Sequence, residues 1–410
     1  MIGKLGLSAS LCLALAASAL SGAEPVRIGG IYPLTGDVAA IGQNIKRGID
    51  FAVAEINAQG GVLGRPIEMI WGDTQGDPKI GMSEAERLIT RGNVSSILGA
   101  YQSAVTEVVS QVAERYQTPF LTAISTANVL TTRGYRYFFR LAPTNMAFLK
   151  SMMQFVSDYN QKELGGRLKT AAIVADNTLL GQETKEWGEY WCKELGFEVI
   201  NVVLYMRGAA DLTSEVLSLK ASKPDILISD NYISDCILLT KTMGEQNFRP
   251  NIVIGKATGF IDPTYIPNVG ALSNGITTAL EWAPDMSNGA ETNAAFRKVY
   301  NIDMNGHSAN AYTATWVLKT AIEKAGSPDR DKIRQALKDT RIIKKFPNGP
   351  EIILPYDEIA FVDIDLNGIK HTNLNYNAIT TVAQIQNGKY VTIWPFEKTD
   401  NKVIYPAPMK

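Results

Sequence analysis

Histidine and cysteine are scarce in this chain, with two and three residues among 410. His307 and His371 lie far from each other and from Cys192 and Cys236 in the sequence, so the spacing of a His/Cys metal site is missing. The glycine motifs of nucleotide-binding loops and the G-x-S-x-G nucleophile elbow are missing as well. These absences argue against the common enzyme classes, and we expect no catalytic residue, no metal and no cofactor.

Long apolar segments are also missing, except at the N-terminus. An apolar run from Leu5 to Leu20 is followed there by the small residues Ser21-Gly22-Ala23. The run is shorter than the ~20 residues that a transmembrane helix needs, and the small residues suit a signal peptidase. We therefore predict a cleavable secretory signal peptide over residues 1–23 and a periplasmic protein. A retained anchor, or a lipoprotein signal at Cys12, is the alternative.

Neither sign of charge is in excess, because the chain has 40 Lys and Arg residues and 41 Asp and Glu residues. Nothing in this balance points to nucleic acid or to an anionic membrane surface as a partner. Export would permit a disulfide between Cys192 and Cys236. We favour two buried free thiols, because the two predicted helices that carry them lie on opposite faces of the expected sheet, beyond the ~7 Å Cα limit of a bridge.

In this sequence β-rich runs alternate with amphipathic helices, and two such series follow one another along the chain. The predicted strands are Val26–Tyr32, Ile67–Trp71, Ser95–Leu98 and Pro119–Thr122, then Thr170–Ala175, Glu198–Tyr205, Ile226–Ser229 and Asn251–Gly255. The predicted helices are Gln43–Ala58, Ile80–Thr90, Ala104–Tyr116, Gln182–Leu195, Leu212–Ala221, Ile233–Gln246, Asn293–Tyr300 and Ser308–Ala325. This predicts an α/β fold with two doubly wound parallel sheets of order 2-1-3-4-5. The tail adds a hairpin at Asn387-Gly388.

Five phrases in fixed order carry a family resemblance. They are YPLTGDVAAIG at Tyr32–Gly42, EINAQGGVLGRPIEMIWGDTQGDP at Glu55–Pro78, ILGAYQSAVT at Ile97–Thr106, LTTRGYRYFFRLAPT at Leu130–Thr144 and ANAYTATWVLKTAIEKAGS at Ala309–Ser327. The chain resembles the branched-chain amino-acid (Leu/Ile/Val) binding proteins of ABC importers, which are type I periplasmic binding proteins. The resemblance covers nearly the whole chain after the leader, but it is poor beyond about residue 355.

The resemblance implies a Venus-flytrap fold with the ligand in a cleft between two lobes. Three crossovers are then expected near Leu141–Asn145, Ala279–Pro284 and Asn348–Ile352. Lobe 1 would comprise residues 24–141 and 284–348, and lobe 2 residues 142–283 and 349–410. Open α/β sheets bind ligands outside the carboxyl ends of their strands, which agrees with a site between the lobes.

The same resemblance assigns binding residues in both lobes. Gln102 and Ser103 stand between a strand and a helix, where a hydroxyl and helix N-terminal amides suit an anion. Ile124-Ser125-Thr126 occupies the position where the family binds the ligand's ammonium and carboxylate, and Tyr232 matches a cleft tyrosine of the second lobe. Helix capping or turn formation is the alternative role for Ser103, Ser125 and Thr126.

The sequence departs from the family where the ligand ammonium is held. The family has an acidic residue after the strand that corresponds to Asn251–Gly255, whereas this chain has Lys256-Ala257. Ile41 and Leu180 replace aromatic residues, and together with Tyr101 and Ala257 we expect them to line the cleft. Asp230 could supply the missing charge, or it could cap the following helix, and the sequence leaves both open.

These features predict the exported solute-binding component of an ABC importer. Its partners would be a small carboxylate-bearing solute and a membrane permease, and we expect a monomer. Without the family's acidic residue, an aromatic or apolar organic acid or a related amide is favoured over a branched-chain amino acid. A periplasmic ligand sensor of the same fold is the alternative function.

Overall fold

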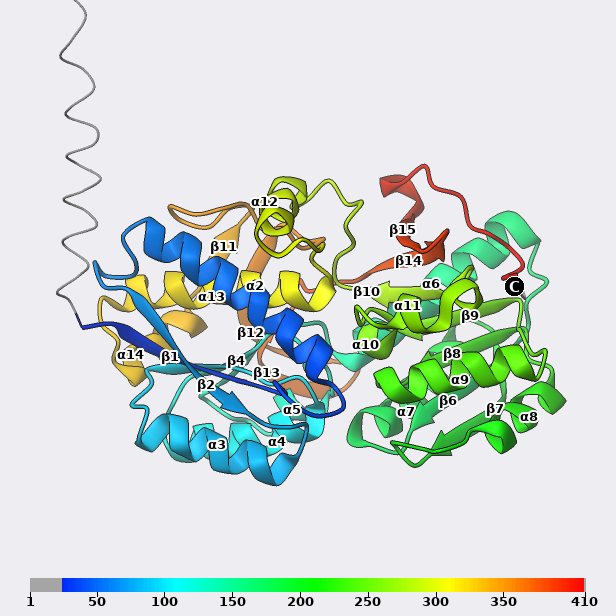
Figure 1. Ribbon diagram of the computed structural model, residues 1–410, viewed down its shortest axis with the longest axis horizontal. Coiled ribbons are helices and arrows are strands. Elements are labelled where there is room, and N and C mark those ends of the chain that lie inside the picture. Colours follow the sequence, from blue (N-terminus) through cyan, green and yellow to red (C-terminus); the bar gives the residue numbers. More distant parts are fainter. Residues whose placement is uncertain (1–23, 409–410) are drawn as a thin grey trace, which may run out of the picture.

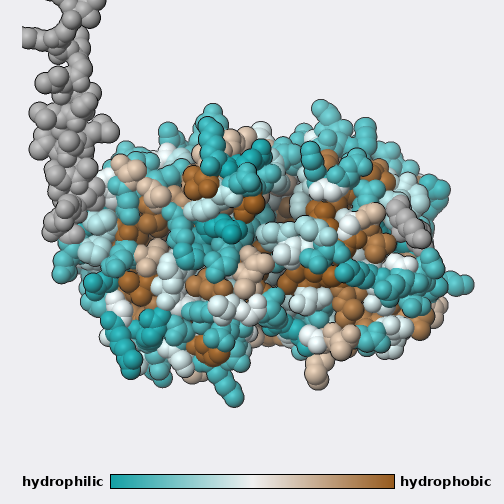
Figure 2. All heavy atoms as spheres, viewed as in Figure 1, coloured by the Kyte–Doolittle hydropathy of each residue, from teal (hydrophilic) through white to brown (hydrophobic). Residues whose placement is uncertain are grey.

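The computed structural model describes residues 24–408, so the predicted signal peptide lies outside the described residues. These residues form two α/β lobes that lie side by side along the long axis of the molecule (Figure 1). On the face that Figure 2 shows, apolar residues form small groups among hydrophilic ones. Within residues 24–408, no helix combines the length and the apolar character that crossing a bilayer requires.

Lobe 1 is built on an eight-stranded sheet of order β11-β12-β13-β5-β4-β3-β1-β2. Its strands are β1 (Val26–Tyr32), β2 (Ile67–Asp73), β3 (Ser96–Gly99), β4 (Phe120–Thr122), β5 (Phe138–Arg140), β11 (Arg341–Ile343), β12 (Glu358–Leu366) and β13 (Ile369–Asn375). Its helices are α2 (Ala39–Ala58), α3 (Pro78–Thr90), α4 (Ser103–Arg115), α5 (Val129–Thr132), α12 (Ala290–Tyr300), α13 (Gly306–Ala325) and α14 (Arg330–Lys338). α2 packs against α13, and α3 packs against α4 below the sheet (Figure 1). Gly48 permits the first contact, because a Cβ there would lie 2.3 Å from the Ser308 carbonyl oxygen.

Lobe 2 is built on a seven-stranded sheet of order β15-β14-β10-β9-β8-β6-β7. Its strands are β6 (Thr170–Asp176), β7 (Glu198–Tyr205), β8 (Ile226–Asp230), β9 (Ile252–Lys256), β10 (Thr277–Leu280), β14 (Thr381–Gln386) and β15 (Lys389–Trp394). Its helices are α6 (Asn145–Leu164), α7 (Leu179–Glu194), α8 (Thr213–Ser222), α9 (Ile233–Glu245), α10 (Ala257–Phe260) and α11 (Tyr265–Val269), with short 3₁₀ turns at Gly270–Ser273 and Phe396–Lys398. β6 to β10 run parallel, and the β14–β15 hairpin adds antiparallel to β10.

The predicted order 2-1-3-4-5 is confirmed in both sheets, as β2-β1-β3-β4-β5 and as β7-β6-β8-β9-β10. The predicted hairpin is also confirmed. Asn387 and Gly388 connect its strands with φ of 51° and 76°, the left-handed conformation that a two-residue turn requires. Cys192 and Cys236 are free and buried, as favoured from the sequence.

The third predicted crossover, near Asn348–Ile352, is wrong. The chain leaves lobe 1 after β13 instead, because β12 and β13 belong to the sheet of lobe 1. Leu374 pairs with Arg140 of β5, and the Phe361 ring packs edge-on against Phe139 at 5.4 Å. Residues 349–375 therefore lie with lobe 1 rather than lobe 2. The β12–β13 hairpin covers the edge of the sheet that β5 would otherwise expose. This pairing can be recognised only in the assembled sheet.

Candidate functional site

The strand ends of the two sheets meet across a closed interlobe pocket. Loops after β3 and β4 form one wall, and loops after β8, β9 and β10 form much of the other. The space between the atoms is about 300 Å³, including a part that is open to solvent. The pocket is lined by Tyr101, Ser103, Ile124, Thr126, Phe148, Leu180, Tyr232, Lys256, Ala257, Thr258, Glu281 and His307.

Of the residues predicted in lobe 1, Tyr101, Ser103, Ile124 and Thr126 line this pocket. Ser103 is the first residue of α4, and its hydroxyl accepts a hydrogen bond from the Ala127 amide at 3.3 Å. The α4 N-terminus therefore faces the pocket with its partial positive charge.

Three other predicted residues of lobe 1 do not line the pocket. The Ser125 hydroxyl is used within its own lobe, where it donates to the Ala100 or Tyr101 carbonyl at 2.9 and 3.0 Å and pairs with the Thr106 hydroxyl. It joins the loops after β3 and β4, which is a structural task. Gln102 and Ile41 are buried outside the pocket lining.

In lobe 2, the predicted residues Leu180, Tyr232 and Ala257 line the pocket. The Tyr232 ring packs edge-on against Tyr101 of lobe 1, with ring centroids 5.7 Å apart. The guanidinium of Arg207 lies 4.5 Å from the centre of the Tyr232 ring on the outside of the pocket. The two tyrosines therefore form an aromatic contact across the cleft, which gives the pocket an apolar wall.

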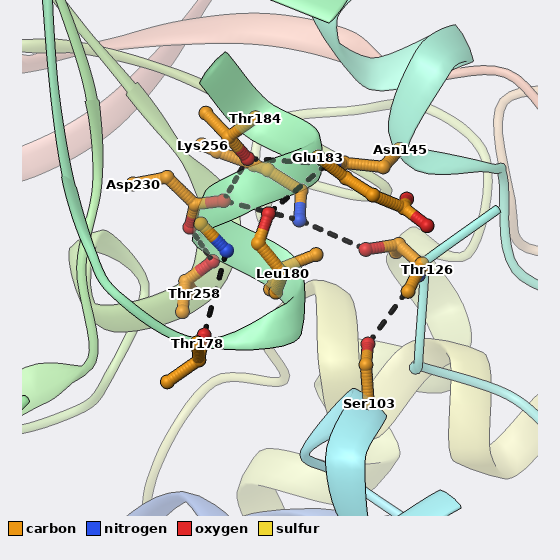
Figure 3. A network of polar contacts seen from close by, with 12 residues as sticks. Ser103, Thr126, Asn145, Thr178, Leu180, Glu183, Thr184, Asp230, Lys256 and Thr258 are labelled. Atoms are coloured by element: carbon orange, nitrogen blue, oxygen red, sulfur yellow. Dashed lines mark hydrogen bonds and ion pairs between the residues drawn. The ribbon is translucent and has the colours of Figure 1, made fainter. Parts of the chain in front are cut away.

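Lys256 lies at the centre of a buried polar network (Figure 3). The side chains of Lys256 and Asp230 are each 2% exposed, and the Lys256 Nζ lies 3.5 Å from Asp230 Oδ2. The Thr184 and Thr258 hydroxyls donate to the Asp230 carboxylate at 2.6 and 2.7 Å. Lys256 also donates to the Thr126 hydroxyl of lobe 1 at 2.8 Å. A cationic group is thus held at the junction of the two lobes.

Asp230 does not take the capping role, which is one of the two roles that the sequence left open. Helix α9 begins after Tyr232 without a side-chain cap, so Asp230 does not cap it. Its carboxylate faces Lys256 instead of the open pocket, so it is already paired. Sequence reasoning named Lys256 only as a departure from the family. A lysine that ends a buried strand was the signal that could have found it.

Glu281 and His307 are pocket residues that sequence reasoning missed. Glu281 follows β10, and burial raises the pKa of its carboxyl to about 7, with the charge of Lys256 opposing the rise. Burial and the nearby Lys256 lower the pKa of His307 to about 3, so this ring is neutral at pH 7. Burial also lowers the pKa of Lys256, while Asp230 opposes that shift. Within residues 24–408, no group of three or more His, Cys, Asp or Glu residues could hold a metal ion.

Polar contacts between the lobes hold the pocket closed. Arg207 of lobe 2 pairs with Asp37 of lobe 1 at 2.7 Å. The Glu183 carboxylate of α7 also accepts hydrogen bonds from the Asn128 and Val129 amides of lobe 1 at 2.6 and 3.1 Å. These contacts break when the lobes separate, so they belong to the closed conformation.

Comparisons with known proteins agree with this architecture. The model of the family described as "Periplasmic binding protein" matches residues 25–362. Leu/Ile/Val-binding protein homolog 7 of Brucella melitensis biotype 1 is 27% identical over 398 residues, which cover 92% of this chain and 94% of the relative.

Two solved structures show the same fold. The branched-chain amino acid transporter substrate binding protein LivJ of Streptococcus pneumoniae, in complex with isoleucine, has a TM-score of 0.75 at 18% identity and covers 93% of this chain and 100% of its own. An ABC-transporter solute binding protein of R. palustris, in complex with benzoate, has a TM-score of 0.74 at 16% identity and covers 94% and 97%. The chain therefore belongs to the periplasmic binding protein family, and the resemblance to the Leu/Ile/Val-binding proteins is confirmed.

Proposed function

We propose that this protein captures a small carboxylate-bearing solute between its lobes in the periplasm and delivers it to the permease of an ABC importer. Members of the family are solute-binding proteins rather than enzymes. We expect the body of the solute to be apolar or aromatic, because the side chains of Tyr101, Phe148, Leu180 and Tyr232 line the pocket.

The observation that carries this proposal is the buried ammonium of Lys256. It reaches from the end of β9 to the Thr126 hydroxyl of the opposite lobe, and both residues line the pocket beside Ser103. A ligand carboxylate placed among these groups would accept charge-assisted hydrogen bonds from both lobes at once. Such a ligand stabilises the closed conformation because it contacts both walls.

Closure explains how one pocket serves transport. In the closed conformation the Arg207–Asp37 pair and the Glu183 hydrogen bonds join the two lobes. Opening is a hinge motion in which the three crossover segments absorb the change of backbone angles. The permease then distinguishes the loaded binding protein from the empty one, because the two lobes of the loaded protein are in the closed arrangement.

The test is a thermal-shift screen followed by titration calorimetry with apolar and aromatic carboxylates, their amides and amino acids. A ligand at 100 times its Kd stabilises the folded protein by about 2.7 kcal/mol. Lys256→Met, Ser103→Ala and Thr126→Ala should each weaken binding, by roughly 10- to 150-fold for a hydrogen bond to a charged group. If no carboxylate raises the melting temperature, or if Lys256→Met binds as tightly as the wild type, the proposal is wrong.

A further inference from the structure

Glu281 is the one acidic residue that lines the pocket in the part of the chain that the structure describes, and it shares the pocket with Lys256. The residue is 1% exposed, and neither carboxylate oxygen has a hydrogen-bond partner of normal geometry among residues 24–408. The charge of Lys256 favours the ionised form of this carboxyl group, whereas burial disfavours it. The two residues are therefore electrostatically coupled, and a charge that enters the pocket acts on both.

The local backbone confines the Glu281 carboxyl group to the pocket. Glu281 directly follows β10, and its Oε2 lies against the first turn of α13, where a Cβ at Gly306 would be 2.6 Å away. Glycine at this position leaves the space that the carboxyl group fills. Because the side chain is almost completely buried in the closed conformation, water does not screen it from charges in the pocket.

One ammonium group serves two carboxylates at this site. Lys256 Nζ lies 3.5 Å from Asp230 Oδ2, and its charge also acts on Glu281. Glu183 on α7 adds another negative charge that acts on Lys256. When these acids are all ionised, negative charge is in excess around Lys256, and a carboxylate ligand would increase that excess.

The other titratable groups that line or adjoin the pocket are neutral at pH 7. Burial lowers the pKa of His307 on α13 to about 3. Burial raises the pKa of the Tyr356 hydroxyl, on which the Glu281 charge also acts, and of the Tyr101 and Tyr232 hydroxyls. None of these groups balances the charge of a carboxylate ligand.

The hydrogen bonds around the two acids decide which of them can take up a proton. The Asp230 carboxylate accepts hydrogen bonds from the Thr184 and Thr258 hydroxyls at 2.6 and 2.7 Å, and such bonds favour the ionised form. Glu281 has no comparable bonds, and burial raises the pKa of its carboxyl to about 7. A like charge within about 4–6 Å disfavours ionisation further, so a ligand carboxylate would protonate Glu281 before Asp230.

We propose that Glu281 determines the charge that the pocket accepts, by taking up a proton when a carboxylate solute binds beside Lys256. The proton comes from the buffer, and the new O–H bond forms on the Glu281 carboxylate. A monocarboxylate is then bound together with about one proton, whereas a neutral amide of the same shape is bound without one. This inference rests on the proposed function, because it concerns a carboxylate in the same pocket.

The proposal predicts the sign of the pH dependence. Below pH 7 Glu281 is mostly protonated before the ligand arrives, so binding takes up little. Above pH 7 it is mostly ionised in the free protein, and each binding event must take a proton from the buffer. Affinity for a carboxylate should therefore fall as the pH rises, by about tenfold between pH 6 and pH 8 if the complex stays protonated.

The experiment compares two acids with their amides. The probes are 3-phenylpropanoate and 3-methylbutanoate with the corresponding amides, titrated by calorimetry at pH 6 and pH 8 in two buffers of different ionisation enthalpy. For the wild type we expect each acid to bind about tenfold more weakly at pH 8 and to take up about one proton there, and each amide to show neither effect. This measurement on the wild type requires no variant to fold.

Glu281→Gln keeps the size of the side chain and removes the titration. We expect this variant to bind each acid with less than about twofold change between pH 6 and pH 8, without proton uptake, and more tightly than the wild type at pH 8. The matched control is Glu55→Gln. Glu55 lies on α2 outside the pocket, is half-buried with a raised pKa, and accepts a hydrogen bond from the Tyr312 hydroxyl at 2.6 Å. This variant should keep the wild-type pH dependence.

Two results would overturn the inference while the proposed function stands. One is an acid that binds to the wild type equally well at both pH values and without proton uptake. The other is proton uptake that persists in Glu281→Gln, which would assign the proton to Lys256. If neither acid binds to the wild type, the inference is wrong as well, and the broader carboxylate screen decides the proposed function separately.

Discussion

The substitution Asp230→Asn tests the buried ion pair most directly. It removes the counter-charge of Lys256 but keeps a side chain of the same shape that can still bond to the Thr184 and Thr258 hydroxyls. At 3.5 Å and an effective dielectric constant of ~20, the attraction between the two charges is about 5 kcal/mol. Breaking a buried pair by removing one partner costs about 3–5 kcal/mol in measured cases. We expect the free energy of unfolding to fall by about that amount at pH 7.

The pH dependence of this variant has a definite sign. The pKa of Lys256 is already lowered by burial, and without Asp230 we expect it to fall further. The unfolded chain then binds one more proton than the folded chain, at Lys256, over the range between the folded pKa and the unfolded value of about 10.4. Stability rises with pH wherever the unfolded state binds more protons, by about 1.4 kcal/mol per pH unit for one group. The defect of Asp230→Asn should therefore shrink between pH 7 and pH 9.

The assay is urea unfolding of the wild type, Asp230→Asn, Lys256→Met and the double variant, followed by circular dichroism at both pH values. The double variant has no unpaired ammonium, so it should be more stable than Asp230→Asn alone, and the four proteins give the coupling energy. A loss below about 0.5 kcal/mol in Asp230→Asn, the range of ordinary surface substitutions, would refute the reasoning. So would a double variant that is no more stable than Asp230→Asn.

Three further predictions concern other parts of the molecule. Arg207→Ala removes a partly exposed contact between the lobes, so ligand affinity should fall less than about fivefold, and the loss should vanish in 0.5 M salt. Arg297→Ala, in a pair within lobe 1, is the control, and equal effects of the two substitutions would contradict a role of the Arg207–Asp37 pair in lobe closure. Gly388→Val places a β-branched residue at φ 76°, so urea unfolding should show a loss of about 1–2 kcal/mol, whereas unchanged stability would mean that the hairpin adapts. Cys192 and Cys236 are buried free thiols, so a thiol reagent should modify them only after unfolding, and rapid modification of the native protein would contradict their burial.

Much of the secondary structure could be predicted from residue periodicity. The bounds of β1 and β7 agree with the predicted strands, because β-rich runs that end at a proline or begin after a glycine leave little freedom. β5 and β10 were not predicted, because runs of three and four residues contain little pattern, although the equally short β3 and β4 were predicted. The wrong third crossover has another cause, because it was expected from the family resemblance, which is poor beyond about residue 355. The alternation in β12 and β13 indicates strands but does not say which sheet they join.

The candidate site divides in a similar way. Ser103, Thr126 and Tyr232 could be placed at the pocket from the family resemblance, and all three line it in the structure. Ser125 also carries a hydroxyl and directly precedes Thr126 in the loop after β4, yet its hydroxyl points into its own lobe. Which hydroxyl of a loop faces the ligand depends on backbone turns that residue spacing does not reveal.

The sequence by itself determined the two series of alternating strands and helices, because hydrophobic periodicity is a local property of the chain, and the family resemblance placed the site between the two lobes. Only the tertiary structure decided the charges of the pocket. Lys256 and Asp230 are 26 residues apart and come from neighbouring strands, while Glu281 follows β10 and His307 lies on α13. Whether such groups pair, stay neutral or remain free for a ligand depends on distances and burial, and these exist only after the two lobes have folded and closed.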